Sequence, residues 1–242
     1  GSSPIITGCT ISNNRAQSGG GIFCYDKSNP NITDCIITNN QSVRNGGGIY
    51  CKNSSPFIDN CTIADNQAIA DDGGGILCKS KSSPHITNCI ITTNRALNGS
   101  GILCHNSSDP TVINCLIVNN RAQIGGGGVL CDVNSAPTFI NCTVVGNQAE
   151  KGGGVYSQNN SSPTVINTIF WADSPQEIYF GIGRPSTISI SYSDVQGGEA
   201  GVVTNDNGVV IWGDGNIRTS SVIPDSDPLF VDTLNGDYHL LD

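Results

Sequence analysis

The sequence has little of what helical or nucleic-acid-binding proteins are made from. Methionine is absent from its 242 residues, lysine and glutamate are scarce, and aromatic residues make up 6%. Because good helix formers are missing, a mainly helical fold is excluded. The formal net charge of −9 leaves no basic face for a phosphate backbone, which excludes nucleic acid as a partner. No apolar run is long enough for a transmembrane helix, so we expect no membrane insertion.

Metal-binding motifs are missing as well. The chain has three histidines and no C-x-x-C motif, which argues against zinc, and we expect no cofactor. Three aspartates near the C-terminus, Asp225, Asp227 and Asp232, are weak candidates for calcium, because their spacing does not match an EF-hand loop.

What the chain does have is a repeat of 26 to 28 residues. A proline marks each copy, at Pro4, Pro30, Pro56, Pro84, Pro110, Pro137 and Pro163. The copies read roughly S-S-P-x-I-x-N-C-x-I-x-x-N-x-A, then a glycine run, then I-x-C. Repeats of this length predict a solenoid in which each copy contacts only its neighbours.

Within a copy, the pattern predicts three short strands joined by three turns. In the copy that begins at Pro84, the strands are expected at 84–87, 89–91 and 102–104. The same phases hold β-branched or aromatic residues in every copy, as a buried pleated wall requires. The first-strand column is Ile6, Ile32, Ile58, Ile86, Val112, Phe139 and Val165. The second is Ile11, Ile37, Ile63, Ile91, Ile117, Val144 and Phe170, and the third is Ile22, Ile49, Ile76, Ile102, Val129 and Val155.

The residue between the first two strands predicts a tight corner. Asparagine tolerates left-handed backbone geometry, and stacked amides can bond to one another along the axis. This column is Gly8, Asp34, Asn60, Asn88, Asn114, Asn141 and Asn167. The predicted fold is therefore all-β, a right-handed parallel β-helix of about seven coils. A β-sandwich does not require one residue type at one phase in seven copies, and the leucine pattern of leucine-rich repeats is missing.

The period is lost after Phe170. We expect residues 1–170 to form the β-helix repeats and residues 171–242 to form terminal coils and a C-terminal cap in the same structural body. A solenoid's last coil exposes core side chains and strand edges, which such a cap covers.

These motifs resemble the bacterial extracellular right-handed β-helix repeat proteins of the pectin-lyase-like superfamily. The glycine run Gly46-Gly47-Gly48-Ile49 and its counterparts are also similar to repeats of chlamydial polymorphic outer-membrane proteins. The resemblance implies a secreted or cell-surface, bacterial-type location. Because that superfamily contains lyases, hydrolases, epimerases and adhesins, the resemblance implies the fold without choosing an activity.

All eleven cysteines lie in two columns. One is Cys9, Cys35, Cys61, Cys89, Cys115 and Cys142, and the other is Cys24, Cys51, Cys78, Cys104 and Cys131. Two alternatives stand: buried free thiols that act as small apolar fillers, or disulfides. Bridges between successive copies would be Cys24–Cys35, Cys51–Cys61, Cys78–Cys89, Cys104–Cys115 and Cys131–Cys142, with Cys9 left over. A whole strand separates the two sites of each pair, which such bridges would have to span.

The third strand predicts two outward-facing columns. One is apolar: Phe23, Tyr50, Leu77, Leu103, Leu130 and Tyr156. It is either a binding face or is covered by loops or by the C-terminal segment. The residues after the cysteines form a polar column: Tyr25, Lys52, Lys79, His105, Asp132 and Gln158. A lyase needs a base and a charge neutraliser, and a hydrolase needs two carboxylates, so Lys79, His105 and Asp132 are the candidates for catalysis.

With one carboxylate in that column, a solvated mixed face is the better interpretation. The sequence therefore predicts a secreted or cell-surface structural or adhesive module, without catalytic residues. It is expected to associate end to end with itself or with flanking domains of a larger protein, or to bind polysaccharide. The alternative is a polysaccharide lyase, hydrolase or epimerase acting on the third-strand face.

Overall fold

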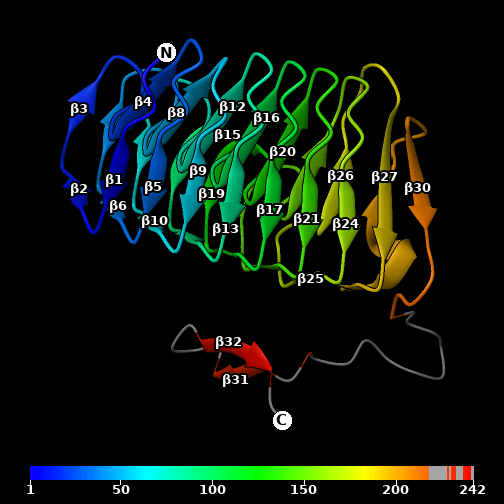
Figure 1. Ribbon diagram of the computed structural model, residues 1–242. Coiled ribbons are helices and arrows are strands. Elements are labelled where there is room, and N and C mark those ends of the chain that lie inside the picture. The colour runs from blue at the N-terminus through cyan, green and yellow to red at the C-terminus, as the bar shows by residue number, and fades with distance from the viewer. Residues whose placement is uncertain (218–227, 229, 233–236, 241–242) are drawn as a thin grey trace.

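The computed structural model describes residues 1–217, 228, 230–232 and 237–240. The chain winds into a right-handed parallel β-helix, as the repeat predicts, and has about eight coils where about seven were expected (Figure 1). Strands stack coil upon coil into long parallel sheets, so the rod axis runs across the strands. Among the described residues the only helix is a single 3₁₀ turn, η1 (Gly198–Gly201), and no helix is long and apolar enough to cross a membrane.

Sheet A contains the first strand of each coil. Its nine strands are β1 (Ile5–Thr7), β5 (Asn31–Thr33), β9 (Phe57–Asp59), β13 (His85–Thr87), β17 (Thr111–Ile113), β21 (Thr138–Ile140), β24 (Thr164–Ile166), β27 (Ser186–Ser191) and β30 (Gly208–Trp212). Sheet B contains the second strand. Its strands are β2 (Thr10–Ser12), β6 (Ile36–Thr38), β10 (Thr62–Ala64), β14 (Ile90–Thr92), β18 (Leu116–Val118), β22 (Thr143–Val145), β25 (Ile169–Trp171) and β28 (Asp194–Val195).

Sheet D contains the predicted third strand. Its strands are β4 (Ile22–Tyr25), β8 (Ile49–Lys52), β12 (Ile76–Lys79), β16 (Ile102–His105), β20 (Val129–Asp132), β23 (Val155–Ser157), β26 (Ile178–Phe180) and β29 (Val202–Val203). The structure adds a fourth, smaller sheet between sheets B and D. This sheet C consists of β3 (Arg15–Ala16), β7 (Gln41–Ser42), β11 (Gln67–Ala68), β15 (Arg95–Asn98) and β19 (Arg121–Gly125).

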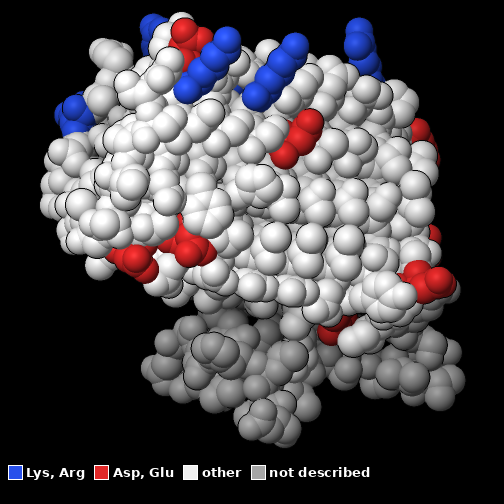
Figure 2. Space-filling model, viewed as in Figure 1, with Lys and Arg blue, Asp and Glu red and all other residues white. Residues whose placement is uncertain are grey.

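The rod's front face has broad uncharged areas, with scattered Asp and Glu side chains between and around them (Figure 2). Figure 2 looks onto sheet A, whose outward side chains are mainly threonine and other uncharged residues, and Lys and Arg side chains gather at the upper edge of the view. After Trp171 the coils continue through β26 to β30, beyond the last regular repeat. The final strands β31 (Phe230–Asp232) and β32 (Asp237–Leu240) form an antiparallel hairpin, and their role as a cap stays a prediction.

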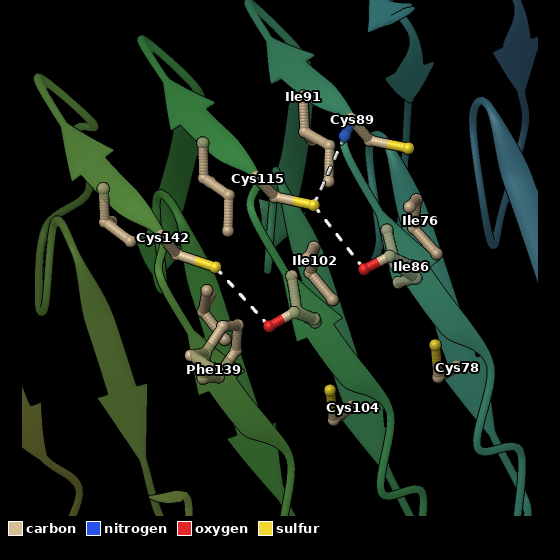
Figure 3. Close-up of a cluster of buried hydrophobic side chains, with 14 of the residues drawn as sticks. Ile76, Cys78, Ile86, Cys89, Ile91, Ile102, Cys104, Cys115, Phe139 and Cys142 are labelled. Carbon is tan, nitrogen blue, oxygen red and sulfur yellow. Dashed lines mark hydrogen bonds between the residues drawn. The ribbon is translucent and has the colours of Figure 1, made fainter. Parts of the chain in front are cut away.

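The core matches the predicted columns. Ile32, Ile58, Ile86 and their counterparts in sheets B and D are fully buried, while the first-coil residues Ile6 and Ile11 are partly buried. Figure 3 shows isoleucines of successive coils packed side by side with the cysteine sulfurs. Each large apolar residue therefore contacts its own equivalent one coil away.

The corner column also behaves as expected. Every member has a positive φ, from 48° at Asn167 to 62° at Gly8, so the chain turns within one left-handed residue. Amides bond along the axis: Asn114 Nδ2 donates to Asn88 Oδ1, and Asn141 Nδ2 donates to Asn114 Oδ1, both at 3.2 Å. The column is interrupted where Asn88 Nδ2 donates instead to Asp59 Oδ1, at 2.8 Å.

A second asparagine column lies inside the rod, directly after sheet B. It comprises Asn14, Asn40, Asn66, Asn94, Asn120 and Asn147, and ends at Asp173. Asn94 is typical: its Nδ2 donates to Ile63 O (2.9 Å) and Asn120 Oδ1 (3.0 Å), and its Oδ1 accepts both N–H groups of Asn66 (3.0 Å each). The five members of this column from Asn40 to Asn147 are completely buried. Their amides therefore supply the hydrogen bonds of backbone groups in a turn that water cannot reach.

Candidate functional site

The polar column predicted after the cysteines is one continuous row on sheet D. Register pairing joins Lys52 to Lys79, Lys79 to His105, and His105 to Asp132, each one coil apart. All four side chains are half-buried. The structure thus brings the three predicted residues Lys79, His105 and Asp132 together on adjacent coils, at about 4.8 Å per step.

His105 and Asp132 form an ion-pair geometry within the row. His105 Nε2 lies 3.8 Å from Asp132 Oδ2, while Asp132 Oδ1 accepts hydrogen bonds from Asn159 Nδ2 (2.7 Å) and Val133 N (2.9 Å). Partial burial, and then the cation of Lys79, lowers the pKa of His105, against the opposing effect of nearby carboxylates. The imidazole of His105 is therefore neutral at pH 7. Its Nδ1 is buried without a hydrogen-bond partner among the described residues.

A second carboxylate, that of Asp72, also affects the pKa of His105. Asp72 was not among the site residues predicted from the sequence. Partial burial raises the pKa of Asp72, and its Oδ1 accepts a hydrogen bond from Asn98 Nδ2 at 2.9 Å. Lys79 and His105 both interact electrostatically with it. A signal was present in the repeat length, because the step from Pro56 to Pro84 is 28 residues and the longer coil carries Asp71 and Asp72 just before its glycine run.

Chemically, this cluster offers a neutral imidazole, an ammonium group and two carboxylates. Asp132 Oδ1 is engaged by two donors and Asp72 Oδ1 by one, so both carboxylates are held in place by hydrogen bonds. Fixed donors and acceptors of this kind suit the recognition of hydroxyl groups. The row also continues past Asp132 to Gln158, whose Oε1 accepts a hydrogen bond from the Tyr156 hydroxyl at 3.0 Å.

The apolar column of sheet D is covered for most of its length, which is the second of the two alternatives that the sequence left open. Tyr50, Leu77, Leu103, Leu130 and Tyr156 are buried, with exposed fractions of 1% to 9%. The cover is the glycine run of each coil. A Cβ at Gly73 would lie 2.7 Å from Leu77 Cβ, and one at Gly99 would lie 2.6 Å from Leu103 Cβ. Both glycines also have positive φ, so only glycine folds this closely over the column.

Aromatic side chains are exposed at one end of sheet D. Phe23 is 47% exposed and Tyr25 is 54% exposed. The Phe23 ring stacks on Tyr50 with centroids 4.8 Å apart and lies 5.7 Å from Tyr25, and Lys52 Nζ lies 5.5 Å from the Tyr25 ring centroid. Of the predicted apolar binding residues, Phe23 alone is available to a ligand.

All eleven cysteines are free thiols, so the bridges between successive copies are not formed and the filler interpretation fits. In one column each Sγ donates to backbone carbonyls: Cys115 Sγ lies 3.6 Å from Ile86 O and also accepts from Cys89 N at 3.4 Å (Figure 3). In the other column, Cys51, Cys78 and Cys104 are paired in register within sheet D. The thiols of the first column stack just before the strands of sheet B and those of the second stack within sheet D, so the two columns lie in different parts of the coil.

The cysteines proposed as bridge partners are free thiols in every coil. Cys24, Cys35, Cys51, Cys61, Cys78, Cys89, Cys104, Cys115, Cys131 and Cys142 are all buried, and Cys9 is the exposed thiol. Burial raises the pKa of Cys142 to about 11, and a hydrogen bond with Cys115 is the main cause that raises the pKa of Cys89 to about 12. Such thiols carry almost no thiolate at neutral pH and are poor nucleophiles.

The calcium candidates lie at the edge of what the structure describes. Asp225 and Asp227 lie outside the described residues, as does the side chain of Asp232. In the described part of the chain, no group of three His, Cys, Asp or Glu side chains is arranged to hold a metal ion.

Comparison with known proteins bears on the fold. A family described as the right-handed β-helix region matches residues 1–170 and, in a second overlapping match, residues 48–222. No curated protein and no solved structure matches the chain.

Proposed function

Because the chain belongs to the right-handed β-helix family, we propose that it is a structural and adhesive module that binds a carbohydrate chain along the polar row of sheet D. The observation that carries the proposal is the row itself, in which Tyr25, Lys52, Lys79, His105 and Asp132 stand in register on successive coils. A linear polymer laid along the rod axis meets one side chain per coil.

The exposed aromatic end supports a sugar ligand. Tyr25 belongs to the same row, and Phe23 projects beside it. Aromatic rings provide a flat apolar surface for the apolar face of a sugar ring, and the polar tips beyond them provide hydrogen bonds. A platform followed by polar side chains fits an extended sugar chain better than it fits a compact ligand.

The rigidity of the module supports a structural role. Each coil is joined to the next by strand pairing and by the buried asparagine column, so the row is held by a fixed scaffold. The proposal places the protein outside the cell, secreted or on a bacterial-type surface, where polysaccharide is found. The buried thiols of Cys89 and Cys142 are protected there, because their raised pKa values keep them unreactive.

The test is binding of soluble polysaccharides by isothermal titration calorimetry. Glycans with and without charge are titrated into the native protein, into Tyr25→Ala and into Lys79→Ala. The expected result is binding to at least one glycan that weakens about tenfold in Tyr25→Ala, which removes a stacking surface. The matched control is Tyr192→Ala, an exposed tyrosine that lies outside sheet D. Equal affinities in the two tyrosine variants would contradict the proposal.

One observation favours the second candidate, a polysaccharide lyase, hydrolase or epimerase. Asp72, which lies outside the row, and Asp132 both interact with His105, so two carboxylates act on this histidine where the sequence suggested one. A neutral imidazole between carboxylates has the composition of a general acid–base site. Turnover by this site would require His105, and a His105→Gln variant that retains full turnover would exclude it.

Association with other chains stays a prediction. β1, β2 and β4 are edge strands of their sheets, and either flanking coils or a second copy would pair with them. Light scattering over a concentration series checks the second case, which predicts a mass that rises with concentration.

A further inference from the structure

Sheet C carries a groove that neither the polar row nor the core accounts for. Along its strands, long outward side chains alternate with a small residue, which is Ser42 in β7 and alanine in the other four strands, because successive residues of a strand face opposite sides. Gln67 and Ile69 flank the buried Ala68, and Arg121 and Gln123 flank the buried Ala122. The small residue between two long ones, repeated coil after coil, leaves an open channel parallel to the rod axis.

The channel extends over several coils. Its first part, about 290 Å³, is lined by residues of β11, β15 and β19, and its second part, about 410 Å³, continues from β19 to Ser174. Arg121 and Gln123 line both parts, so the two parts are adjacent. The column that forms one wall is in register throughout: Gln67 pairs with Arg95, Arg95 with Arg121, and Arg121 with Gln148.

Two guanidinium groups therefore stand on adjacent coils in the middle of this wall. Arg95 and Arg121 are both exposed, and their strands are about one strand spacing apart. Throughout the described residues the single contact within 4.0 Å between a basic and an acidic side chain is that of His105 with Asp132, so neither arginine has a carboxylate partner. Like charges directly opposite one another in a sheet are destabilising. The sequence nonetheless places two of its few cations here, in a chain of net charge −9.

We propose that Arg95 and Arg121 together bind a tetrahedral oxyanion, a sulfate or phosphate group carried by an extended polymer that lies in the sheet C groove. One such group presents oxygens in several directions, so it can accept from two guanidinium forks at once. A sulfate ester offsets one of the two positive charges, and a phosphate monoester offsets up to two. A carboxylate has two coplanar oxygens and one charge, which suit a single fork. Gln67 and Gln148 on either side supply amide donors for neighbouring polar groups.

The groove also limits where the anion binds. Glu150 lines its far part and would repel a negative group there. The anion is therefore held between the two arginines, over the small residues Ala96 and Ala122. This site lies on a different sheet from the polar row of sheet D, so the two proposals stand or fall separately.

The experiment is calorimetric titration at low ionic strength with four probes: sulfated dextran oligomers, inorganic tripolyphosphate, oligogalacturonate and uncharged dextran. The expected result is binding of the first, the second or both, with oligogalacturonate at least tenfold weaker and no binding of dextran. The sulfated and phosphate probes separate the two sources of the same oxyanion.

Variants identify the site. The Arg95→Gln/Arg121→Gln double variant is expected to lose at least tenfold in affinity, and Arg95→Lys/Arg121→Lys is expected to lose part of it, because lysine keeps the charge but not the fork. Arg44→Gln removes an exposed arginine outside the groove and is the matched control, expected to bind as the native protein does. Equal loss in Arg44→Gln, equal binding of oligogalacturonate, or no binding of either oxyanion probe by a folded native protein would overturn the proposal.

Discussion

Two columns of asparagine run along the rod, and they differ in one physical respect. The column after sheet B, represented by Asn94, is completely buried, whereas the corner column, represented by Asn114, faces solvent. Both stack amides at the coil spacing. In the buried column each amide satisfies backbone groups that water cannot reach, while in the corner column water replaces any bond that is lost. Asparagine at the same spacing therefore stabilises the buried column through its hydrogen bonds, whereas in the corner column it serves mainly because it tolerates a left-handed backbone.

The largest expected effect is in the buried column. Asn94→Ala removes four buried hydrogen bonds, those that the Asn94 amide donates to Ile63 O and Asn120 Oδ1 and those that it accepts from the backbone N–H and Nδ2 of Asn66. Each buried unsatisfied group costs about 1–3 kcal/mol, so the variant should lose on the order of 5 kcal/mol of unfolding free energy. Denaturant unfolding measures the loss. A loss below about 1 kcal/mol would show that the buried and exposed columns do not differ as described.

The end of the buried column gives the second prediction. Asp173 takes the place of asparagine beside Glu177, and burial raises the pKa of Asp173 to about 7. The folded state thus holds this proton at pH values where the unfolded chain has released it. Stability from this group is full below about pH 4 and is lost as the pH rises towards 7, by about 2–4 kcal/mol.

The matched variant is Asp173→Asn, which extends the amide column by one coil. Its Oδ1 can keep both bonds from Asn147, and its amide nitrogen is a donor at every pH, whereas the native carboxyl group loses its one donor when it ionises. We expect the native protein to lose stability relative to the variant between pH 4 and pH 8, measured by thermal unfolding. Parallel pH profiles for the two proteins would show that Asp173 does not carry a buried proton.

The exposed column should respond weakly. Asn114 has a φ of 53°, and alanine in that conformation is strained by about 1 kcal/mol, with little further cost because its amide faces water. Asn114→Gly removes the strain and should unfold at nearly the native denaturant concentration. If Asn114→Ala lost as much stability as Asn94→Ala, solvent exposure would not be what separates the two columns.

The smallest expected change concerns the thiols, which stack in the same way as the amides. In the native protein only Cys9 is exposed, so one thiol should react with a labelling reagent. After denaturation without reductant, eleven thiols should be alkylated. Mass spectrometry counts both, and a peptide containing Cys51 linked to Cys61 would restore the bridged alternative.

The sequence was sufficient for the fold because the core columns repeat. Apolar residues recur at the phases of Ile91 and Ile102 in every copy. An apolar residue type that is repeated at one phase in every coil indicates that this position is buried. The left-handed corner at Asn88 could be predicted for the same reason, since few residues adopt that geometry. The buried role of Asn94 was missed, although it repeats equally well, because a polar residue in a turn is ordinarily assigned to solvent.

The candidate site was harder to predict because it depends on what lies over each strand. Alternation alone places Leu77 outside the sheet, and only the close approach of Gly73 shows that the side chain is covered. Asp72 reaches His105 through a two-residue extension of a single coil, which the shared repeat pattern does not contain. The strand register predicted that Lys79, His105 and Asp132 are neighbours. A contact made by a residue in an irregular coil, such as Asp72, cannot be predicted from the repeat pattern.

The most direct test of a binding module without catalysis combines binding and turnover on the same polymer. Pectin, polygalacturonate and alginate are incubated with the native protein, with and without calcium, and followed by ultraviolet absorbance for unsaturated sugars and by reducing-end release for hydrolysis. We predict that neither signal appears, including on any polymer that the protein binds, because the two carboxylates that act on His105 are held by hydrogen bonds to Asn98 and Asn159 rather than as a paired acid and base. Turnover that disappears in Asp132→Asn or Lys79→Ala would contradict the structural and adhesive role and establish an enzyme.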